Sequence, residues 1–454
     1  MQTQSLGEGS VGKLLVKLSL PAILAQLVNM LYNIVDRIFI GHIPVVGSDA
    51  LTGVGVTFPV VLLISAFAVL VGMGGAPRAA IMMGKKDDAA AERIMGNCFS
   101  LTILTSILLT AVFLAFGEPL LKLFGASDAT VRFGWEYLRV YILGTLFVQI
   151  SIGMNAFLTT QGFAKESMIT VIIGAVLNII LDPIFIYLFD MGVAGAAWAT
   201  ILSQGVGSAW ILWFLCSKRS KLRLKFATMR LRKEVILPVL ALGISPFIMQ
   251  STESLLSICY NTSLQRYGGD IAVGAMTICA SIIQFVNMPL TGLCQGAQPI
   301  ISFNYGAGNL ARVKKTFWLL FVICVGYCSL FFLAVETLPR MFASIFSSDA
   351  ALTDYAAWVL RIYFFGIFAS GAQRACQQTF VALDEAKCSI FLALLRKIIL
   401  LIPLIYILPN FFADKVFSVF LAEPIADIIA ACCTTALFLW RFRKIAKNMA
   451  NPAN

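Results

Sequence analysis

Long apolar blocks alternate with short segments rich in Gly, Pro and charged residues along nearly the whole chain. Each block is long enough for a membrane-spanning helix, which needs about 20 apolar residues. Only helices and closed barrels pair all their backbone polar groups in lipid, and an unbroken run such as residues 101–116 favours a helix. The pattern therefore predicts an all-α polytopic membrane protein with twelve transmembrane helices, at 14–41, 51–83, 92–117, 133–160, 167–188, 194–216, 235–266, 272–304, 313–338, 356–382, 388–409 and 415–441.

Basic residues gather in alternate loops between these blocks. The largest group is KRSKLRLKFATMRLRK at 218–233, and further Lys and Arg residues lie at 85–86, 312–315 and 441–447. Cytoplasmic loops of membrane proteins carry an excess of Lys and Arg, so both termini are predicted to be cytoplasmic. We expect an uncleaved first helix and a multi-pass protein of the cell inner (cytoplasmic) membrane.

The two halves of the chain resemble each other. LRVYILG at 138–144 matches LRIYFFG at 360–366, an offset of 222 residues, and the same offset relates the Ala-Lys pairs at 164–165 and 386–387. Six spans followed by six spans is a parallel repeat, which is typical of alternating-access transporters. The predicted domains are an N-terminal lobe at 1–217, a basic cytoplasmic linker at 218–234 and a C-terminal lobe at 235–454.

The composition excludes a water-soluble globule. Of the 454 residues, 59% are hydrophobic and 13% are charged, against about 25% charged in a soluble domain. The net charge of +11 is concentrated in a loop between two apolar runs, so it indicates membrane topology and no nucleic-acid partner. The eleven cysteines form no paired CxxC framework, and most lie inside apolar runs as small core residues.

A carboxylate lies inside the first apolar block. Asp36 belongs to LVNMLYNIVDRIFIG at 27–41. A charged side chain at bilayer depth costs roughly 2.5 kcal/mol or more, so it usually faces a cavity and marks an ion path, a proton relay or a substrate site. Two alternatives stay open, because partners such as Arg37 could satisfy the carboxylate within the bundle, or it could reach the interface.

Further polar residues fall at a similar depth in other spans. Asp36 lies about 33 Å along the first span, and Asp182 lies about 26 Å beyond Lys165 on a helix that runs the same way. Asn178 occupies the same helix face one turn before Asp182, and Thr200 on the next span can reach this layer. Carboxylate, amide and hydroxyl oxygens are the ligands that small hard cations take. A helix-to-helix hydrogen bond for Asn178 and ordinary packing for Thr200 are the alternatives.

Three segments together resemble the multidrug and toxic compound extrusion (MATE) family, prokaryotic type: VDRIFIG at 35–41, LNIILDPIFIY at 177–187 and GVAGAAWATILSQ at 192–204. The resemblance implies two pseudo-symmetric six-helix lobes that form a V-shaped cavity. It also implies a secondary active antiporter that exports amphipathic or cationic drugs in exchange for H⁺ or Na⁺ by alternating access. We expect a monomer in contact with membrane lipids, and no cofactor beyond the coupling ion.

The resemblance also assigns a coupling site. In the family, a first-span Asp, a fifth-span Asn and Asp and a sixth-span Thr are implicated in cation or proton coupling. These positions correspond to Asp36, Asn178, Asp182 and Thr200, which would also bind the metal ion if the protein is coupled to Na⁺. Asp36 maps onto Asn261 at an offset of 225, and nothing acidic matches Asp182. The coupling layer is therefore expected in the N-terminal lobe alone.

The predicted substrate cavity includes a second carboxylate. Glu253 lies about 27 Å along the seventh span and is expected to attract cationic drugs or to make a structural contact. Some sodium-coupled relatives join a seventh-span Glu to a tenth-span Asp, but the tenth span here has no Asp, and Arg374 lies too deep to pair with Glu253. Whether Glu253 forms a second cation site stays open. Other predicted cavity residues are Tyr32, Asn33, Met154, Asn155, Phe157, Met249, Asn261, Gln284, Met288, Gln373 and Gln377.

Two other classes of function are alternatives to export. A lipid or lipid-linked oligosaccharide flippase of the same superfamily should carry several basic residues in its cavity for phosphate, and beyond Arg37 and Arg374 we expect the spans to offer few. The sequence has no HExxH motif, no Gly-Asp protease pair and no Ser and His placed as partners, so we expect neither an enzyme nor catalytic residues.

Overall fold

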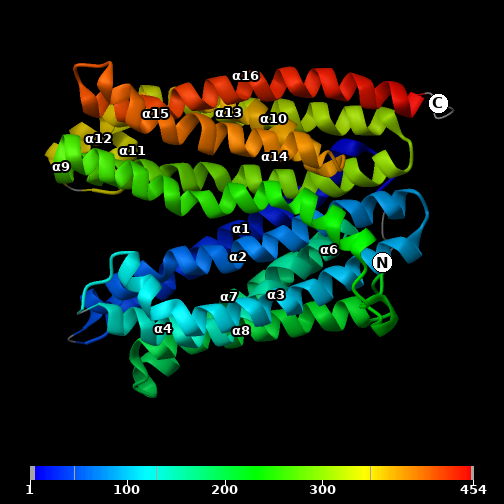
Figure 1. Cartoon of the computed structure of the whole chain (residues 1–454), viewed down its shortest axis with the longest axis horizontal. Coiled ribbons are helices and arrows are strands. Elements are labelled where there is room, and N and C mark those ends of the chain that lie inside the picture. Colours follow the sequence, from blue (N-terminus) through cyan, green and yellow to red (C-terminus); the bar gives the residue numbers. More distant parts are fainter. Residues whose placement is uncertain (1–5, 45, 129, 348, 451–454) are drawn as a thin grey trace.

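Helices form nearly all of the ordered chain, as the apolar pattern predicts. The computed structural model describes residues 6–44, 46–128, 130–347 and 349–450, and no strand occurs in these ranges. The all-α fold class is therefore confirmed. Figure 1 shows two groups of helices side by side, with the start of α1 and the end of α16 at the same end of the bundle, which we call the terminal end.

The first group forms the N-terminal lobe, drawn in blue to green in Figure 1. Its helices are α1 (Val11–Gly41), α2 (Gly47–Gly84), α3 (Asp88–Leu123), α4 (Val131–Leu143), α5 (Thr145–Gln149), the π-helix η1 (Ile150–Met154), α6 (Asn155–Thr160), α7 (Ala164–Pro183), the π-helix η2 (Ile184–Leu188) and α8 (Gly192–Cys216). The predicted linker at 218–234 follows and contains the short 3₁₀ helix η3 (Phe226–Thr228).

The second group forms the C-terminal lobe, drawn in green to red. Its helices are α9 (Lys233–Gly306), α10 (Leu310–Thr337), α11 (Pro339–Ser344), α12 (Ala350–Tyr363), α13 (Ile367–Ala382), α14 (Ala386–Leu394), the π-helix η4 (Leu395–Leu401), α15 (Ile402–Ile407), the 3₁₀ helix η5 (Leu408–Asn410) and α16 (Lys415–Ala450).

The number of spans follows from three broken helices. In the described ranges, nine helices are long and apolar enough to cross a membrane, or eleven when the bent pairs α4 with α5–α6 and α12 with α13 each count as one span. Helix α9 is 74 residues long and is interrupted at Gly269, whose φ of 65° and ψ of −159° are not helical. With its two arms counted separately the total is twelve, which agrees with the number expected from the sequence.

The internal repeat appears in the structure as matched landmarks. The fourth span bends by 64° after Val131–Leu143, and the tenth span bends by 50° after Ala350–Tyr363. The residues at the two bends, Gly144 and Gly366, lie 222 positions apart. The N-caps Asp87 and Asn309, which accept from the backbone N–H three residues on, have the same separation. Both halves therefore share one backbone plan.

Close backbone contacts join the lobes at the terminal end. A Cβ atom on Gly243 of α9 would lie 1.9 Å from the Leu70 carbonyl oxygen of α2. A Cβ atom on Gly306 of α9 would lie 2.0 Å from the Ile81 carbonyl oxygen of α2. No side chain fits at these positions, so glycine lets α2 and α9 meet directly. The Arg78 side chain of α2 forms an ion pair with Asp384 of the C-terminal lobe. Burial raises the pKa of the Asp384 carboxyl, and the Arg78 guanidinium opposes that shift.

Candidate functional site

Asp36 is buried on α1, as expected for a carboxylate with a function inside the bundle. Its Oδ1 atom is enclosed and has no hydrogen-bond partner in the described part of the chain. The neighbouring Arg37 is exposed and lies over the Phe58 ring at 5.8 Å from the ring centre. Within the described residues Asp36 forms no ion pair, and Arg37 acts on it only as a nearby charge, so Arg37 compensates the carboxylate in part.

The fifth and sixth spans bring three predicted residues together. The Asn178 Nδ2 group donates to Asp182 Oδ1 at 3.1 Å and to Thr200 Oγ1 at 3.5 Å. The first contact follows from the four-residue spacing on one helix face, and the second joins α7 to α8. All three side chains are buried. The predicted association of Asn178, Asp182 and Thr200 is thus present, and the hydrogen bond expected as the alternative role of Asn178 is present as well.

Three oxygen atoms in this layer are buried without a hydrogen-bond partner among the described residues: Asp36 Oδ1, Asn178 Oδ1 and Asp182 Oδ2. The Asp36 and Asp182 carboxylates also interact electrostatically. Leaving a buried acceptor unpaired costs about 1–3 kcal/mol, so such atoms are uncommon and need an explanation. A hard cation bound by oxygen atoms, or a proton on a carboxylate, would satisfy them. The donor set therefore fits Na⁺ or H⁺. We call Asp36, Asn178, Asp182 and Thr200 the N-lobe oxygen layer.

The backbone around the N-lobe oxygen layer is irregular. Pro183 directly follows Asp182 and ends the α-helical part of the span, and the π-helix η2 (Ile184–Leu188) continues it. Proline removes a backbone donor, and π-helical turns are frequently found at functional sites. The Tyr187 hydroxyl of η2 donates to the Phe39 carbonyl of α1 at 2.7 Å. A hydrogen bond therefore joins the first and fifth spans near the two carboxylates, in the parts of these spans that lie away from the terminal end.

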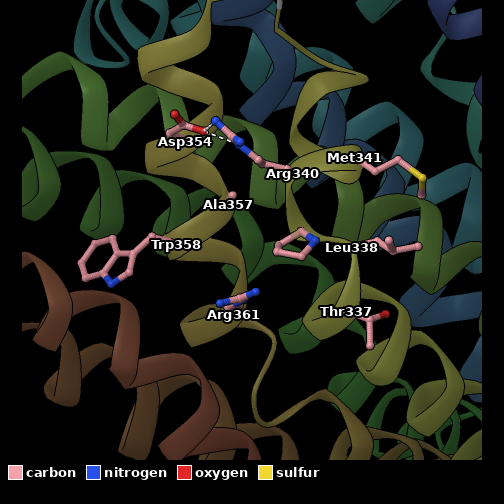
Figure 2. A pocket seen from close by; sticks show the side chains of 9 residues that line it. Thr337, Leu338, Arg340, Met341, Asp354, Ala357, Trp358 and Arg361 are labelled. Carbon is pink, nitrogen blue, oxygen red and sulfur yellow. Dashed lines mark hydrogen bonds and ion pairs between the residues drawn. The ribbon is translucent and has the colours of Figure 1, made fainter.

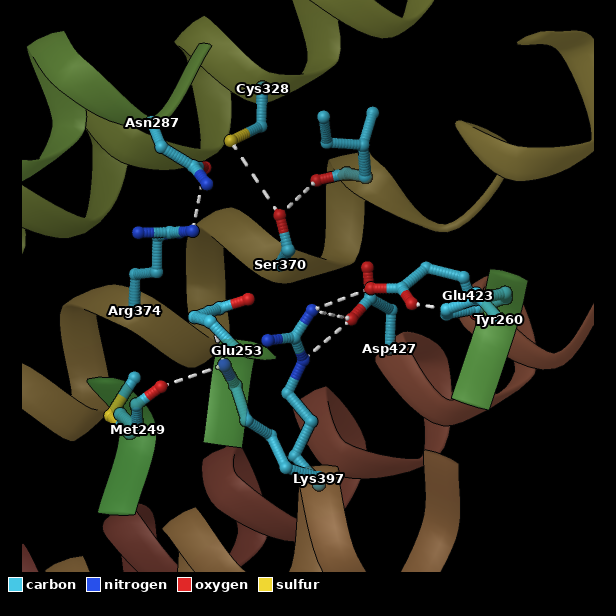
Figure 3. A network of polar contacts seen from close by, with 12 residues as sticks. Met249, Glu253, Tyr260, Asn287, Cys328, Ser370, Arg374, Lys397, Glu423 and Asp427 are labelled. Atoms are coloured by element: carbon cyan, nitrogen blue, oxygen red, sulfur yellow. Dashed lines mark hydrogen bonds and ion pairs between the residues drawn. The ribbon is translucent and has the colours of Figure 1, made fainter. Parts of the chain in front are cut away.

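The C-terminal lobe contains a charged network that we did not predict (Figure 3). Arg396 of η4 pairs with Glu423 at 3.0 Å and with Asp427 at 2.6 Å, both on α16. Its neighbour Lys397 pairs with Glu253 of α9. Membrane depth could have identified this network, because Arg396 and Lys397 lie inside the apolar block 388–409 and Glu423 and Asp427 lie inside 415–441.

The network also corrects the expected shortage of basic residues in the spans. Arg396 and Lys397 add two bases to the pair named from the sequence, but both are neutralised by carboxylates and neither is free to hold a phosphate. Arg374 forms no ion pair with Glu253 in the described chain and instead donates to the Asn287 side chain at 2.6 Å. The depth argument against an Arg374–Glu253 pair is consistent with that contact.

Four of the predicted cavity residues are buried in the structure. Met154 and Phe157 are 0% exposed in the apolar core of the N-terminal lobe, so they do not line an accessible cavity. Gln373 and Gln377 are buried too, and Gln377 donates to the Ser245 and Ser389 side chains, which makes it a contact between helices. In this conformation none of these four side chains is open to a cavity, and their part in substrate binding stays a prediction. The remaining candidates are partly or fully exposed: Tyr32, Asn33, Asn155, Met249, Glu253, Asn261, Gln284 and Met288.

Exposed polar side chains indicate which face of α9 is directed to the space between the lobes. Glu253, Ser257 and Asn261 are exposed at four-residue intervals, which places them in one row along the helix. The exposed apolar residues Leu255 and Ile258 lie on a different face. Because a carboxylate is especially costly in lipid, we infer that the polar row is directed to the space between the lobes and the face of Leu255 and Ile258 to lipid.

A cavity of about 470 Å³ lies far from these residues, between α10, α11 and α12 (Figure 2). Arg340 and Asp354 form an ion pair at 2.5 Å on its wall. It is lined by Thr337, Leu338, Pro339, Arg340, Met341, Asp354, Ala357, Trp358 and Arg361. None of the residues predicted for coupling or for the substrate cavity belongs to it, so it is separate from the candidate site.

Comparisons with known proteins agree with the helical fold described above. The chain is 25% identical to "Multidrug export protein MepA" of Staphylococcus saprophyticus, over 93% of each chain. It is 24% identical to the protein of the same name from Staphylococcus aureus, over 92% of each. A structure described as "Crystal structure of MATE in the bent conformation" matches 99% of this chain and 100% of its own, with a TM-score of 0.93 and 23% identity. The MatE family model matches residues 21–184 and 246–407, so the chain belongs to the MatE family.

Proposed function

We propose that this protein is a secondary active multidrug efflux antiporter, which exports amphipathic or cationic compounds in exchange for H⁺ or Na⁺. The single observation that carries the proposal is the set of buried, unpaired oxygen atoms on Asp36, Asn178 and Asp182. The relatives named as multidrug export proteins support the export of drugs. The proposal needs no cofactor other than the coupling ion, and places a monomer in the inner membrane with both termini in the cytoplasm.

The N-lobe oxygen layer supplies the coupling step. Without a bound ion, two carboxylates share a buried region in which neither forms an ion pair within the described chain, which is unfavourable. Entry of one cation or proton removes that penalty. Its movement across 100 mV releases about 2.3 kcal/mol, enough for roughly a fiftyfold gradient of substrate. The movement of one ion or proton through this layer thus supplies enough free energy to drive export.

Occupancy of the layer is transmitted through α1. This helix carries Asp36 in its outer part and contains Pro21, which weakens helical hydrogen bonding one turn before it. The Tyr187–Phe39 contact makes α1 respond to any rearrangement of the fifth span. We propose that ion or proton binding reshapes α1 around Pro21 and releases the substrate on the side away from the terminal end.

The test is dye efflux from proteoliposomes in which proton and sodium gradients are imposed separately. We expect one of the two gradients to drive efflux by the wild-type protein, and Asp36→Asn to lose the gradient-driven part completely while remaining folded. Asp128→Asn removes an exposed acid of the same lobe and is the matched control, for which wild-type efflux is expected. Wild-type efflux by Asp36→Asn would refute the coupling role of Asp36.

The same vesicles separate export from lipid translocation. If neither gradient affects the dye while a fluorescent lipid crosses the membrane without ATP, the protein is a flippase instead. The ion pairs of Arg396 and Lys397 argue against that result, because a phosphate would have to displace a carboxylate from each base.

A further inference from the structure

Lys397 and Glu253 form an ion pair between the eleventh and seventh spans (Figure 3). The Lys397 ammonium donates to Glu253 Oε1 and also to the Met249 carbonyl oxygen at 2.8 Å, one helical turn before Glu253. The π-helix η4 presents Lys397 and Arg396 together, and the described chain gives each of them its own carboxylate partner. The position of the ammonium is therefore fixed by two acceptors on one helix.

The two members of the pair differ strongly in exposure. The Lys397 side chain is 3% exposed, whereas the Glu253 side chain is 60% exposed. A carboxylate has about four lone-pair sites on its two oxygens, and the described residues give Glu253 one hydrogen bond, from Lys397. The ammonium thus occupies one side of this carboxylate, and the other side is open to a second cation.

The open side of Glu253 faces the space between the lobes. Glu253 belongs to the exposed polar row with Ser257 and Asn261, away from the lipid-directed face of Leu255 and Ile258. A cation that reaches Glu253 from this space meets the carboxylate and, directly behind it, the Lys397 charge. Attraction to the first is therefore offset by repulsion from the second.

The charges in the surrounding network are already balanced. Glu253, Glu423 and Asp427 provide three carboxylates, and Arg396, Lys397 and Arg374 provide three bases (Figure 3). This lobe consequently needs no inorganic ion to neutralise it, in contrast to the N-lobe oxygen layer. A small cation would lose its hydration for a carboxylate that is half neutralised, whereas a large organic cation also gains apolar contacts.

We propose that Lys397 sets the affinity of Glu253 for cationic substrates: it is a built-in competitor, against which a monovalent organic cation binds to the open side of the carboxylate. This inference rests on the proposed export function, because an exporter has to release what it binds. A free carboxylate at this depth would hold a cation tightly and slow its release. With the competing ammonium in place, the cation binds more weakly and leaves more readily.

Equilibrium binding to the purified full-length protein tests the role of Lys397. The probes are ethidium, a monovalent organic cation, and Nile red, a neutral dye, both followed by fluorescence in detergent. We expect Lys397→Met to bind ethidium on the order of tenfold to a hundredfold more tightly, as the loss of one nearby positive charge predicts. Nile red binding should not change. Lys387→Met alters an exposed lysine of the same span and should bind both dyes as the wild type does.

Two further variants make the result decisive. Lys397→Gln keeps a donor toward the Met249 carbonyl without the charge, and should also tighten ethidium binding. The double variant Glu253→Gln with Lys397→Met should lose the gain, because the carboxylate that attracts the cation is absent. Unchanged ethidium affinity in Lys397→Met and Lys397→Gln would overturn the proposal. Failure of both variants to fold, judged by gel filtration and thermal unfolding, would also overturn it by showing that Lys397 is structural.

The binding assay uses no ion gradient, so its outcome is separable from that of the efflux assay. Tighter ethidium binding by Lys397→Met, in a protein that shows no ion-driven efflux, would support this inference and refute the proposed function. Ion-driven efflux together with unchanged ethidium binding in the variants would do the reverse.

Discussion

The two lobes share one backbone plan but satisfy the carboxylates inside their spans in different ways. In the N-terminal lobe, Asp182 accepts from the Asn178 amide, and one oxygen atom each of Asp36 and Asp182 is buried without a hydrogen-bond partner in the described chain. In the C-terminal lobe, Glu423 and Asp427 share the Arg396 guanidinium, and Glu253 has Lys397. The acids of one lobe therefore keep unpaired oxygen atoms in the described chain, and those of the other lobe are paired with bases of the chain.

This difference indicates how a duplicated fold can divide its tasks. The matched bends at Gly144 and Gly366 show that the repeat keeps the helix geometry. Polar side chains inside the spans are under no such constraint, because an acid can be neutralised either by a mobile ion or by a base on a neighbouring helix. We infer that a mobile ion binds only where no base is fixed beside the acid.

The largest expected effect comes from removing the base that the C-terminal lobe supplies. Arg396→Met leaves Glu423 and Asp427 buried without their shared partner, and breaking a buried ion pair in this way costs about 3–5 kcal/mol. Thermal unfolding in detergent should show a large loss of stability. The exposed Arg340–Asp354 pair provides the control, since Arg340→Met should change stability little.

A compensated variant decides whether charge is the cause. Arg396→Met combined with Glu423→Gln and Asp427→Asn removes the unpaired charges as well as the base, and should recover most of the lost stability. If the single variant melts like the wild type, the Arg396 network does not stabilise the lobe. If the triple variant is no better than the single one, packing of the Arg396 side chain outweighs its charge.

The second effect concerns the coupling ion that we propose to bind at the N-lobe oxygen layer. We expect the coupling ion to stabilise the wild-type protein against unfolding by about 2.7 kcal/mol at a concentration of 100 times its Kd. Asp182→Asn should abolish that increment. The stability without ion should rise, because the variant removes one of two neighbouring buried charges while its amide oxygen can still accept from Asn178. Unfolding is measured over a sodium series and, separately, over a pH series.

Asp128→Asn again serves as the control and should retain the full ion-dependent increment. An undiminished increment in Asp182→Asn would place the ion site elsewhere and would remove the contrast between the lobes. The direction of the effect distinguishes the two lobes, because the Arg396 variant loses stability without ion and the Asp182 variant loses the response to ion.

The sequence predicted the spans better than the breaks within them. Apolar run length determines where a helix crosses the membrane, so most span boundaries lie within a few residues of the observed helix ends. The bends at Gly144 and Gly366 left no mark in hydropathy, because the residues around them are as apolar as the rest of their spans. The π-helix η4 does contain two charged residues, Arg396 and Lys397, but a charge in an apolar run does not indicate a π-helix. A glycine in an apolar run does not by itself indicate a bend.

The two sites were predictable to different extents. The contact of Asn178 with Asp182 follows from four-residue spacing, so the sequence alone could place both side chains together. The Lys397–Glu253 pair joins spans far apart in the chain, and no local pattern specifies such a contact. Large apolar residues such as Met154 and Phe157 suit both a cavity and a core, and sequence alone does not distinguish the two; in this structure both are packed in the core.

A third prediction probes a single hydrogen bond of the C-terminal lobe. The Tyr260 hydroxyl donates to Glu423 Oε2 at 2.9 Å. A hydrogen bond to a charged group contributes about 1.5–3 kcal/mol, so Tyr260→Phe should lower stability by about that amount. The ion-dependent increment should stay at the wild-type value. A changed ion response would mean that the two lobes are coupled through α9, contrary to the division proposed above.

The smallest effect is expected at Thr200, the weakest member of the N-lobe oxygen layer. Its hydroxyl lies 3.5 Å from Asn178 Nδ2, at the long limit of a hydrogen bond, so Thr200→Ala should cost less than about 1 kcal/mol in stability. As an oxygen ligand it matters more to the ion: loss of the hydroxyl should weaken ion affinity about fivefold, read as a shift of the sodium or pH midpoint of stabilisation. Thr200→Ser keeps the oxygen and should restore the midpoint. Equal midpoints in the wild type and Thr200→Ala would assign Thr200 to helix packing and reduce the layer to Asp36, Asn178 and Asp182, with its contrast to the self-neutralised lobe intact.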